Sequence, residues 1–598
     1  MSTATPRFQR LRGIGLWFAR NDQLVLSVLA AIIGAAVAYG VIGFLALITL
    51  LQELTFANDL TFGSTLERVF SFALDLPWWH IILVPTAGGF LIGLFLKFAM
   101  PGGQAQGVAQ VIEAGALRGG HIGLDRGLGA AVVSAATLGF GGSAGREGPM
   151  IHLGGAMASF TTRHLHLNPQ LSQTLLGCGV AAGIAASFNA PIAGVIFALE
   201  VVIRHYALSA FSPIVIAAVA GTVISRFHLG DFPAFIVPPF TVGSFWEFPA
   251  YVLLGFLASG IAILFMTSLM QAQEAAKRIP APPWLHPTFG GLIVGLIAVF
   301  YPQILGVGYE TTDALLQGNI PLTLIIALVA AKLLATTATL GLGFGGGVFS
   351  PSLFLGAALG AAFGMIAAIP FPDLASSPTL YAIIGMGAVA APVLGAPIST
   401  ILILFELTGD FTVTAAAMTA VVIASITTRQ LIGKSYFELQ LERAGISLSG
   451  GPARALLRQQ RVRDVARHGF HSVNGDTSID ALRSLMKLEP GRTFFVTDEG
   501  TLVGVIATSD LVQAALDPDK SANLTARDIA GLNPIFLVCN DNLEHALAVL
   551  AQVPEDDVPV VRDAQSLEVV GLVRHHDVLS VFNQALLKVQ AEEHDERP

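Results

Sequence analysis

The chain has 598 residues, of which 53% are hydrophobic and only 12% charged, with a mean hydropathy of +0.69 and a formal net charge of −9. These values lie well outside the range of ordinary soluble domains and predict a membrane protein. The only two cysteines, Cys178 and Cys539, exclude a disulfide framework and a cysteine-based metal site.

Charge is unevenly distributed along the chain. The last 148 residues hold 36 of the 73 Asp, Glu, Lys and Arg side chains. This contrast marks a boundary near Gly450 between a bilayer-embedded body and a soluble C-terminal module of ordinary composition.

The first apolar stretch follows a basic N-terminal segment, residues 1–23, that contains Arg7, Arg10, Arg12 and Arg20. The stretch is too long for a signal-peptide core and has no small-residue cleavage site near its start. We therefore expect a retained first membrane span. The positive-inside rule predicts that the N-terminus is cytoplasmic.

Further apolar stretches predict ten or more membrane helices. Several are shorter than the roughly 20 residues needed to cross a bilayer, or are interrupted by Gly and Pro. Broken helices survive at membrane depth only when buried in protein or facing a water-filled cavity, and transporters place substrate sites there. The stretches lie at about 24–52, 79–98, 128–160, 172–202, 208–226, 249–270, 287–302, 321–345, 353–369, 379–405 and 412–427.

An internal repeat accompanies these interruptions. The segment NAPIAGVIFALE at 189–200 is similar to GAPISTILILFE at 395–406, and the turns GREGP at 145–149 and GVFSP at 347–351 precede them. Similar interrupted segments at matched spacing indicate a midplane site between two repeats. The alternative is a chance similarity of small residues in glycine-rich helices.

Glu147 lies in the first of these turns, where an isolated carboxylate must be paired, protonated or directed at a polar cavity. Gly145, Gly148 and Pro149 predict a loop that enters a helix, whose free N–H groups and positive dipole end attract anions. The alternative is a simple pair with Arg146, although adjacent helical residues point to different faces. For Arg146 itself we expect a structural role, bonding loop carbonyls or reaching the surface.

The second turn follows the same logic, because Gly345, Gly346 and Gly347 leave backbone amides unobstructed ahead of a helix started by Ser350 and Pro351. We expect the two helix N-termini to converge on one small anion. Ionised Glu147 would occupy this site, and protonated Glu147 would vacate it. The sequence indicates the roles of three further polar residues less specifically. We expect Glu200 and Glu406 to be either structural or functional, and His152 to be a hydrogen-bonded polar residue rather than a ligand.

After Gly450 the sequence contains two similar stretches, 493–514 and 558–582. Each predicts strand, turn, strand and helix, with Asp510 and Asp577 near the helix starts, where acidic side chains suit the dipole. This pattern indicates a duplicated α/β module.

Together, GREGP, FNAPIAGVIFALE, GGGVFSPSLFLGA and GAPISTILILFELTGD resemble the motifs of the CLC chloride channels and proton-coupled chloride exchangers, in that family's order and spacing. The resemblance implies an α-helical multi-pass membrane protein with inverted repeats of tilted and broken helices, followed by a C-terminal α/β CBS-domain pair. It also implies a homodimer with one pore in each subunit. The implied domains are the transport domain 24–445, a linker 446–460, CBS domains 461–520 and 521–584, and an acidic tail 585–598.

The resemblance makes Glu147 the gate that exchanges protons, and it places the amides of Val348 and Phe349 at the central anion. Two side-chain donors depart from the family pattern. Gln106 stands where a serine is usual, and Phe437 stands where a tyrosine is usual, although Tyr436 is adjacent. The implied anion site consists of Gln106, Gly107, Gly145, Arg146, Val348, Phe349, Tyr436 and Phe437.

Val201 occupies the position where exchangers of this family often carry an inner proton-transfer glutamate. This favours a passive chloride channel, with a proton-coupled exchanger of chloride, bicarbonate or nitrate as the alternative. A CBS-regulated cation channel would need clustered pore carboxylates, and an intramembrane enzyme would need a nucleophile and base or paired metal ligands. We expect a bacterial cytoplasmic membrane protein with both termini cytoplasmic, and neither a metal nor a nucleic-acid partner.

The tail resembles CBS domains, which often bind adenine nucleotides through an aspartate, and the corresponding aspartates here are Asp510 and Asp577. However, Ala507 and Arg574 stand where a Thr or Ser usually precedes each aspartate. A purely structural, dimer-stabilising tail is the alternative, and transport itself requires no cofactor.

Overall fold

The computed structural model describes residues 22–57, 69–204, 208–231, 235, 237–238, 247–372, 375–446, 457–458, 460–488, 493–507, 510, 524–531, 534–553 and 557–594. The N-terminal arginines, most of the predicted linker and the last four residues lie outside the described residues. Internal contacts divide the chain into two compact units, Met1–Ile446 and Ser447–Pro598.

Helices are the regular elements of the first unit among the described residues, and nine of them are long and apolar enough to cross a membrane. Four shorter apolar helices accompany them, as the interrupted stretches predict. The elements are α2 (Asp22–Phe56), α3 (Val69–Leu74), α4 (Trp78–Ala99), η1 (Pro101–Gly103), α5 (Val108–Leu117), α6 (Leu124–Gly139), α7 (Glu147–His164), α8 (Pro169–Phe188), α9 (Pro191–Phe197), η2 (Ala198–Ile203), α10 (Leu208–Leu229), α11 (Phe248–Ala276), η4 (Pro283–Leu285), α12 (His286–Phe300), η5 (Pro302–Ile304), α13 (Tyr309–Leu316), α14 (Leu322–Gly341), α15 (Phe349–Ala367), α16 (Pro378–Leu394), α17 (Pro397–Thr408), α18 (Phe411–Ile432) and α19 (Tyr436–Arg443).

The two interrupted segments break in the same way. Helix α8 ends at Asn189 with φ 57° and α16 ends at Gly395 with φ 70°, both in the left-handed region. Pro191 and Pro397 then start α9 and α17, where proline suits the first helical position. The structure therefore confirms the repeat that the sequence predicts.

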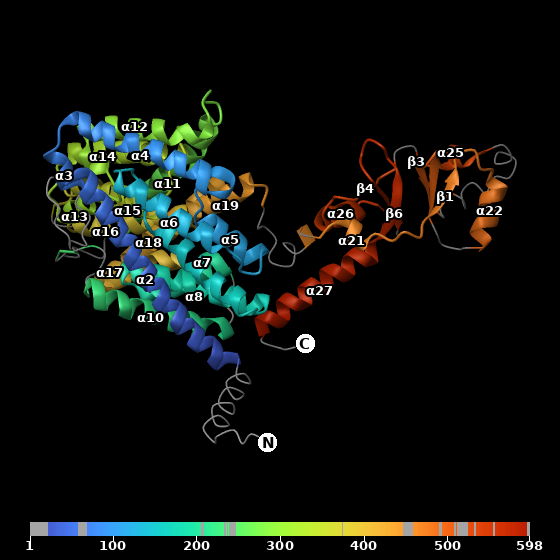
Figure 1. Ribbon diagram of the computed structural model, residues 1–598, viewed down its shortest axis with the longest axis horizontal. Helices are drawn as coiled ribbons and strands as arrows, with labels where there is room; N and C mark the ends of the chain where they lie inside the picture. Colours follow the sequence, from blue (N-terminus) through green and yellow to red (C-terminus); the bar gives the residue numbers. More distant parts are fainter. Residues whose placement is uncertain are drawn as a thin grey trace, which may run out of the picture. The chain divides into compact units, whose positions relative to one another are not determined.

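Equivalent glycines hold each interrupted hairpin together. Gly154 and Gly356 each lie five residues after the proline in the first turn of their helix, and each faces a glycine on the next helix, Gly179 or Gly385. A Cβ atom on Gly154 would come within 2.3 Å of the Gly179 carbonyl oxygen, and one on Gly356 within 2.2 Å of the Gly385 oxygen. Helices α7 and α8, like α15 and α16, therefore pack backbone to backbone, as small residues allow in membranes (Figure 1).

The second unit contains two sheets of identical topology (Figure 1). In each sheet the first strand pairs in parallel with the second, which pairs antiparallel with the third. A register irregularity falls within β2 and within β5, so the duplication extends to the backbone detail. The elements are α21 (Val462–Val465), β1 (His471–Asn474), α22 (Ile479–Leu488), β2 (Phe494–Asp498), β3 (Thr501–Ile506), α25 (Ala526–Ile529), β4 (Leu537–Val538), α26 (Leu543–Leu550), β5 (Asp557–Val561), β6 (Val569–Arg574) and α27 (His575–His594).

The two modules of this unit share part of their core. Phe495 and Leu502 of the first sheet pack with Val561 and Leu572 of the second in one buried apolar cluster. The predicted strand, turn, strand and helix pattern is present in the second module, where α27 extends into the predicted acidic tail. The helix predicted after β3 lies mostly outside the described residues.

Candidate functional site

The two glycine-containing turns of the repeats meet and pair with each other. The Gly145 N–H donates to the Gly347 carbonyl at 2.7 Å, and the Gly347 N–H donates back to the Gly145 carbonyl at 2.8 Å. The two glycines are equivalent positions, each four residues before the proline of its turn. This symmetric bridge places the first turns of α7 and α15, from opposite halves, beside one another.

Glu147 is fully buried at the start of α7, and its carboxylate lies against the start of α15. The Ser350 hydroxyl donates to both carboxylate oxygens at 2.5 Å, and the Ser350 N–H donates to Oε2 at 3.3 Å. The first N–H groups of a helix have no intrahelical carbonyl to bond. The carboxylate therefore occupies a position at a helix N-terminus that suits an anion.

Tyr309, at the start of α13, supplies a further donor to this carboxylate. Its hydroxyl donates to Glu147 Oε1 at 2.8 Å. The guanidinium carbon of Arg146 lies 4.5 Å from the centre of the Tyr309 ring, a cation–π distance. Arg146 Nε is 3.9 Å from Glu147 Oε1, farther than the three hydroxyl and amide donors. Arg146 is only 9% exposed and does not reach the surface. The surface position, one of the two roles predicted for it, is therefore wrong.

Lys332, on α14, holds the turn that leads into Tyr309. Its fully buried ammonium donates to the carbonyls of Ile304, Gly306 and Val307 at 3.0 to 3.2 Å. Gly308, with φ 90°, follows this turn, and a Cβ atom there would lie 3.1 Å from Lys332 Nζ. Sequence reasoning missed both Tyr309 and Lys332. A single lysine within an apolar helix is the signal that marks this place, because such a charge requires a partner.

Val348 and Phe349, two residues of the predicted anion site, lie at the start of α15, and both are buried. The Phe349 ring packs against Phe188 at 5.0 Å and against Phe197 at 6.3 Å between ring centres. These contacts join the start of α15 to the interrupted segment of the other half.

The predicted site residues of the other two helices have different surroundings. Gln106 is partly exposed before the start of α5, and the Gly107 N–H donates to Gln110 Oε1 at 2.8 Å. The Tyr436 hydroxyl meets two amide groups, Nε2 of Gln440 at 3.0 Å and Nε2 of Gln273 on α11 at 3.4 Å. Phe437, beside it, is buried. Helix α19 packs on α5, so these predicted residues lie on neighbouring elements.

Glu200 and Glu406 cap each other's helices. Glu200 accepts from the N–H groups of Ile398 and Ser399 at the start of α17, at 3.0 and 2.8 Å. Glu406 accepts from the N–H groups of Ile192 and Ala193 at the start of α9, at 2.9 and 2.8 Å. The geometry supports the structural alternative for both. Val201, next to Glu200, is buried within η2.

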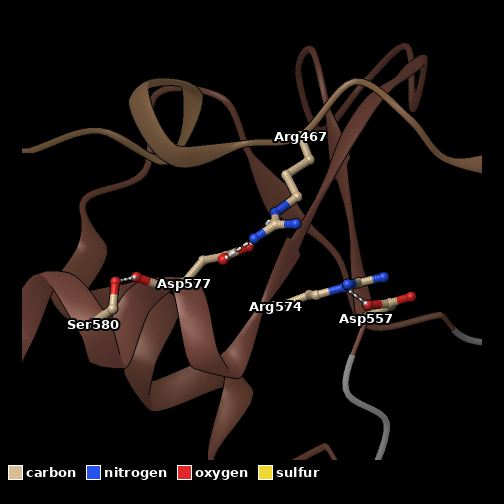
Figure 2. A network of polar contacts seen from close by, with 5 residues as sticks. All are labelled: Arg467, Asp557, Arg574, Asp577 and Ser580. Atoms are coloured by element: carbon tan, nitrogen blue, oxygen red, sulfur yellow. Dashed lines mark hydrogen bonds and ion pairs between the residues drawn. The ribbon is translucent and has the colours of Figure 1, made fainter.

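In the second unit, Asp577 is engaged by Arg467, which follows α21 and pairs through its backbone with Leu572 of β6. Figure 2 shows the Arg467 guanidinium facing the Asp577 carboxylate, with Nε and Nη2 donating at 2.8 and 2.5 Å. This bond and the charge of Asp577 raise the pKa of Arg467. Arg574 donates in turn to Asp557 at 2.7 Å. Both Asp577 oxygens accept from Arg467, so a ribose hydroxyl would have to share this carboxylate with the guanidinium.

Asp510 also has a local partner, because its Oδ2 accepts from the Ala507 N–H at 2.9 Å. Ala507 has no side-chain hydroxyl to offer a nucleotide. The residues present at both aspartates therefore fit an adenine nucleotide poorly.

Comparisons with known proteins agree with this architecture. Residues 88–429 match the family described as voltage gated chloride channel, and residues 462–517 match the CBS domain. A ClcB-like chloride channel protein of Ralstonia nicotianae is 33% identical over 419 residues, which cover 69% of this chain and 96% of that protein.

Two solved structures share the fold. A slow cyanobacterial Cl⁻/H⁺ antiporter has a TM-score of 0.62 at 22% identity, covering 70% of this chain and 97% of that one. A eukaryotic CLC transporter has a TM-score of 0.61 at 19% identity, covering 93% of this chain and 98% of that one.

Proposed function

Because the chain belongs to the voltage-gated chloride channel (CLC) family, we propose that it carries chloride or a similar small anion across the membrane, with Glu147 as the gate. The observation that carries this proposal is the position of the Glu147 carboxylate, which accepts from Ser350 at the start of α15. A permeating anion would bind the same donors once the carboxylate leaves. Weak binding by helix N-termini suits an ion that must also be released.

Passive conduction is the form of transport that we favour. Val201 is a buried apolar side chain at the inner position, and it carries no proton. Proton-coupled exchange is the second candidate, since a likeness in fold to a Cl⁻/H⁺ antiporter supports it. In both cases protonation of Glu147 removes its charge from the anion path, so flux should rise in acid.

The test is anion flux in liposomes with simultaneous recording of internal pH. Vesicles containing the purified chain receive a chloride gradient and no proton gradient. Passive conduction predicts chloride efflux without uphill proton movement, and exchange predicts proton movement against its gradient that stops when the chloride gradient is removed. The absence of anion flux under both acidic and neutral conditions would contradict the proposed function.

We further propose a homodimer in a bacterial cytoplasmic membrane, with both termini in the cytoplasm. The basic residues before the first span support this orientation. The similarity to a protein of a bacterium supports the choice of membrane. The mass of the purified chain in detergent tests the dimer directly.

A further inference from the structure

Tyr309 differs from the other donors to Glu147 in where it comes from. Ser350 belongs to the helix N-terminus that also suits the anion, whereas Tyr309 comes from a separate helix, α13. Resting on the proposed function of Glu147 as the gate, we propose that Tyr309 holds the Glu147 carboxylate in the closed position and sets the pH at which the pathway opens.

The donor geometry gives the physical reason. A hydroxyl that donates to a carboxylate stabilises its ionised form more than its protonated form, and hydrogen bonds to charged groups are among the strongest in proteins. The Tyr309 hydroxyl, at 2.8 Å, therefore favours the blocking state of Glu147. Without it, a lower proton concentration should open the gate.

Few other groups bear on this equilibrium among the residues that the structure describes. The charged or titratable side chains that face the carboxylate are Arg146, at the start of α7, and Tyr309 itself. Helix α15 contributes the neutral Ser350, and α5 contributes the apolar Val108 next to Gly148. Loss of the phenol hydroxyl therefore leaves both the Arg146 charge and the N-terminus of α15 in place.

Tyr309 is also fixed from several sides, so it does not follow Glu147 when the carboxylate moves. Lys332 holds the preceding turn, and the next residue, Glu310, accepts from the Phe70 N–H at 2.8 Å at the start of α3. Arg146 covers one side of the ring, and Phe235 packs 4.6 Å away between ring centres. The hydrogen bond between Tyr309 and Glu147 therefore breaks when the gate opens.

The test compares chloride flux against external pH for four reconstituted chains: wild type, Tyr309→Phe, Glu147→Gln and Tyr251→Phe. Phenylalanine keeps the ring beneath Arg146 and removes only the hydroxyl. Tyr251→Phe is the matched control, because the Tyr251 hydroxyl donates to a different buried carboxylate, Glu247, at 2.5 Å. All four chains are checked for the same elution volume before reconstitution.

Tyr309→Phe should move the half-activating pH upward by about one unit, and it should raise flux at neutral pH. Tyr251→Phe should match wild type, and Glu147→Gln should show no pH dependence. The double variant, Tyr309→Phe with Glu147→Gln, should behave like Glu147→Gln alone. An unchanged or lowered half-activating pH for Tyr309→Phe, or a further change in the double variant, would overturn the inference.

These outcomes separate the inference from the function on which it rests. If Glu147→Gln keeps the normal pH dependence, the gate assignment itself fails. If flux through Glu147→Gln shows no pH dependence and Tyr309→Phe has the half-activating pH of wild type, the assignment of Glu147 as the gate is retained. The role proposed for Tyr309 is then wrong.

Discussion

The side chain of Glu147 places a carboxyl group at the N-terminus of a helix from the opposite half. Its partners Ser350 and Tyr309 lie far away in the sequence, and the carboxylate is fully buried among them. A buried charge is tolerated when it is paired and hydrogen-bonded. The same donors that stabilise the carboxylate suit a free anion, and under the proposed function the side chain and the ion would compete for one place.

Replacing Glu147 with Gln should therefore remove the pH dependence of flux while retaining or raising anion flux. The amide keeps the size of the side chain and carries no charge at any pH. The measurement is chloride flux between acidic and neutral pH, with Glu247→Gln, another buried carboxylate, as the control. Normal pH-gated flux in Glu147→Gln would show that the gate is elsewhere.

A second prediction concerns Gln106 and Phe437, which replace a serine and a tyrosine usual in the family. We expect the selectivity among chloride, nitrate and bicarbonate to differ from that of typical members. Gln106→Ser combined with Phe437→Tyr should shift preference toward chloride by about fivefold, the effect of roughly one hydrogen bond. Competition flux measurements decide this, with Tyr251→Phe as the control. An ordinary chloride preference in the wild type would contradict the prediction.

The sequence was sufficient to place Glu147 and the start of α15, because the turn residues and the repeat are both local patterns. It was not sufficient to find Tyr309, whose hydroxyl reaches Glu147 across 162 residues of sequence. The fragment VGYE shows no periodicity or spacing that points to the GREGP turn. Only the fold, through the turn held by Lys332, brings the two together.

Among the elements, α9 and α17 form a reciprocal pair. Each begins with a proline, and each first turn receives a carboxylate from the end of the other segment, Glu406 or Glu200. Two antiparallel helices thereby satisfy each other's free N–H groups within a region of low polarity, where such groups are costly to leave unbonded.

Glu406→Gln should lower the stability of the protein by about 1–2 kcal/mol, because a neutral amide caps a helix N-terminus less well than a carboxylate. Glu200→Gln should have a similar effect. Thermal unfolding in detergent measures both. Glu274→Gln serves as the control, since Glu274 and Lys277 form an exposed ion pair worth little. Equal melting temperatures for Glu406→Gln and the control variant would rule out a capping role for Glu406.

The positions of the helix breaks were predictable from sequence where they depended on proline and glycine, as in the interrupted segments that break at Asn189 and Gly395. The roles of Glu200 and Glu406 remained open from sequence, because a terminal acid on a short apolar helix fits either a structural or a functional role. The distances to the partner helix favour the structural one.

For the molecule as a whole, the charge contrast near Gly450 reflects two units that each contain a core. The C-terminal unit is a pair of similar modules joined by a shared apolar cluster, and Arg467 pairs with Asp577 beside the second sheet. Its duplicated strands were readable from sequence. The ion pair between Arg467 and Asp577 could not be predicted from sequence, since the two residues are 110 positions apart.

We propose that Arg467 excludes adenine nucleotide from Asp577, so the C-terminal pair is structural in the wild type. The full chain should show no saturable ATP or AMP binding by equilibrium dialysis at millimolar nucleotide. The double variant Arg467→Ala with Arg574→Thr removes the partner of Asp577 and introduces a hydroxyl. It should bind the nucleotide at least about tenfold more tightly than the wild type does.

Arg562→Ala is the control for this experiment, because Arg562 pairs with Glu568 at the surface rather than with Asp577. Saturable binding by the wild type, or no gain in the double variant, would show that Arg467 is not what keeps nucleotide out.

The bridge between Gly145 and Gly347 also sets an order of events during synthesis. Glu147 is synthesised 203 residues before Ser350, an interval of about 10 to 40 s at ordinary translation rates. Gly347 and Ser350 are both missing until near the end of that interval, and Tyr309 is made 162 residues after Glu147. The turn that carries Glu147 therefore lacks these partners until the second half of the chain has been synthesised.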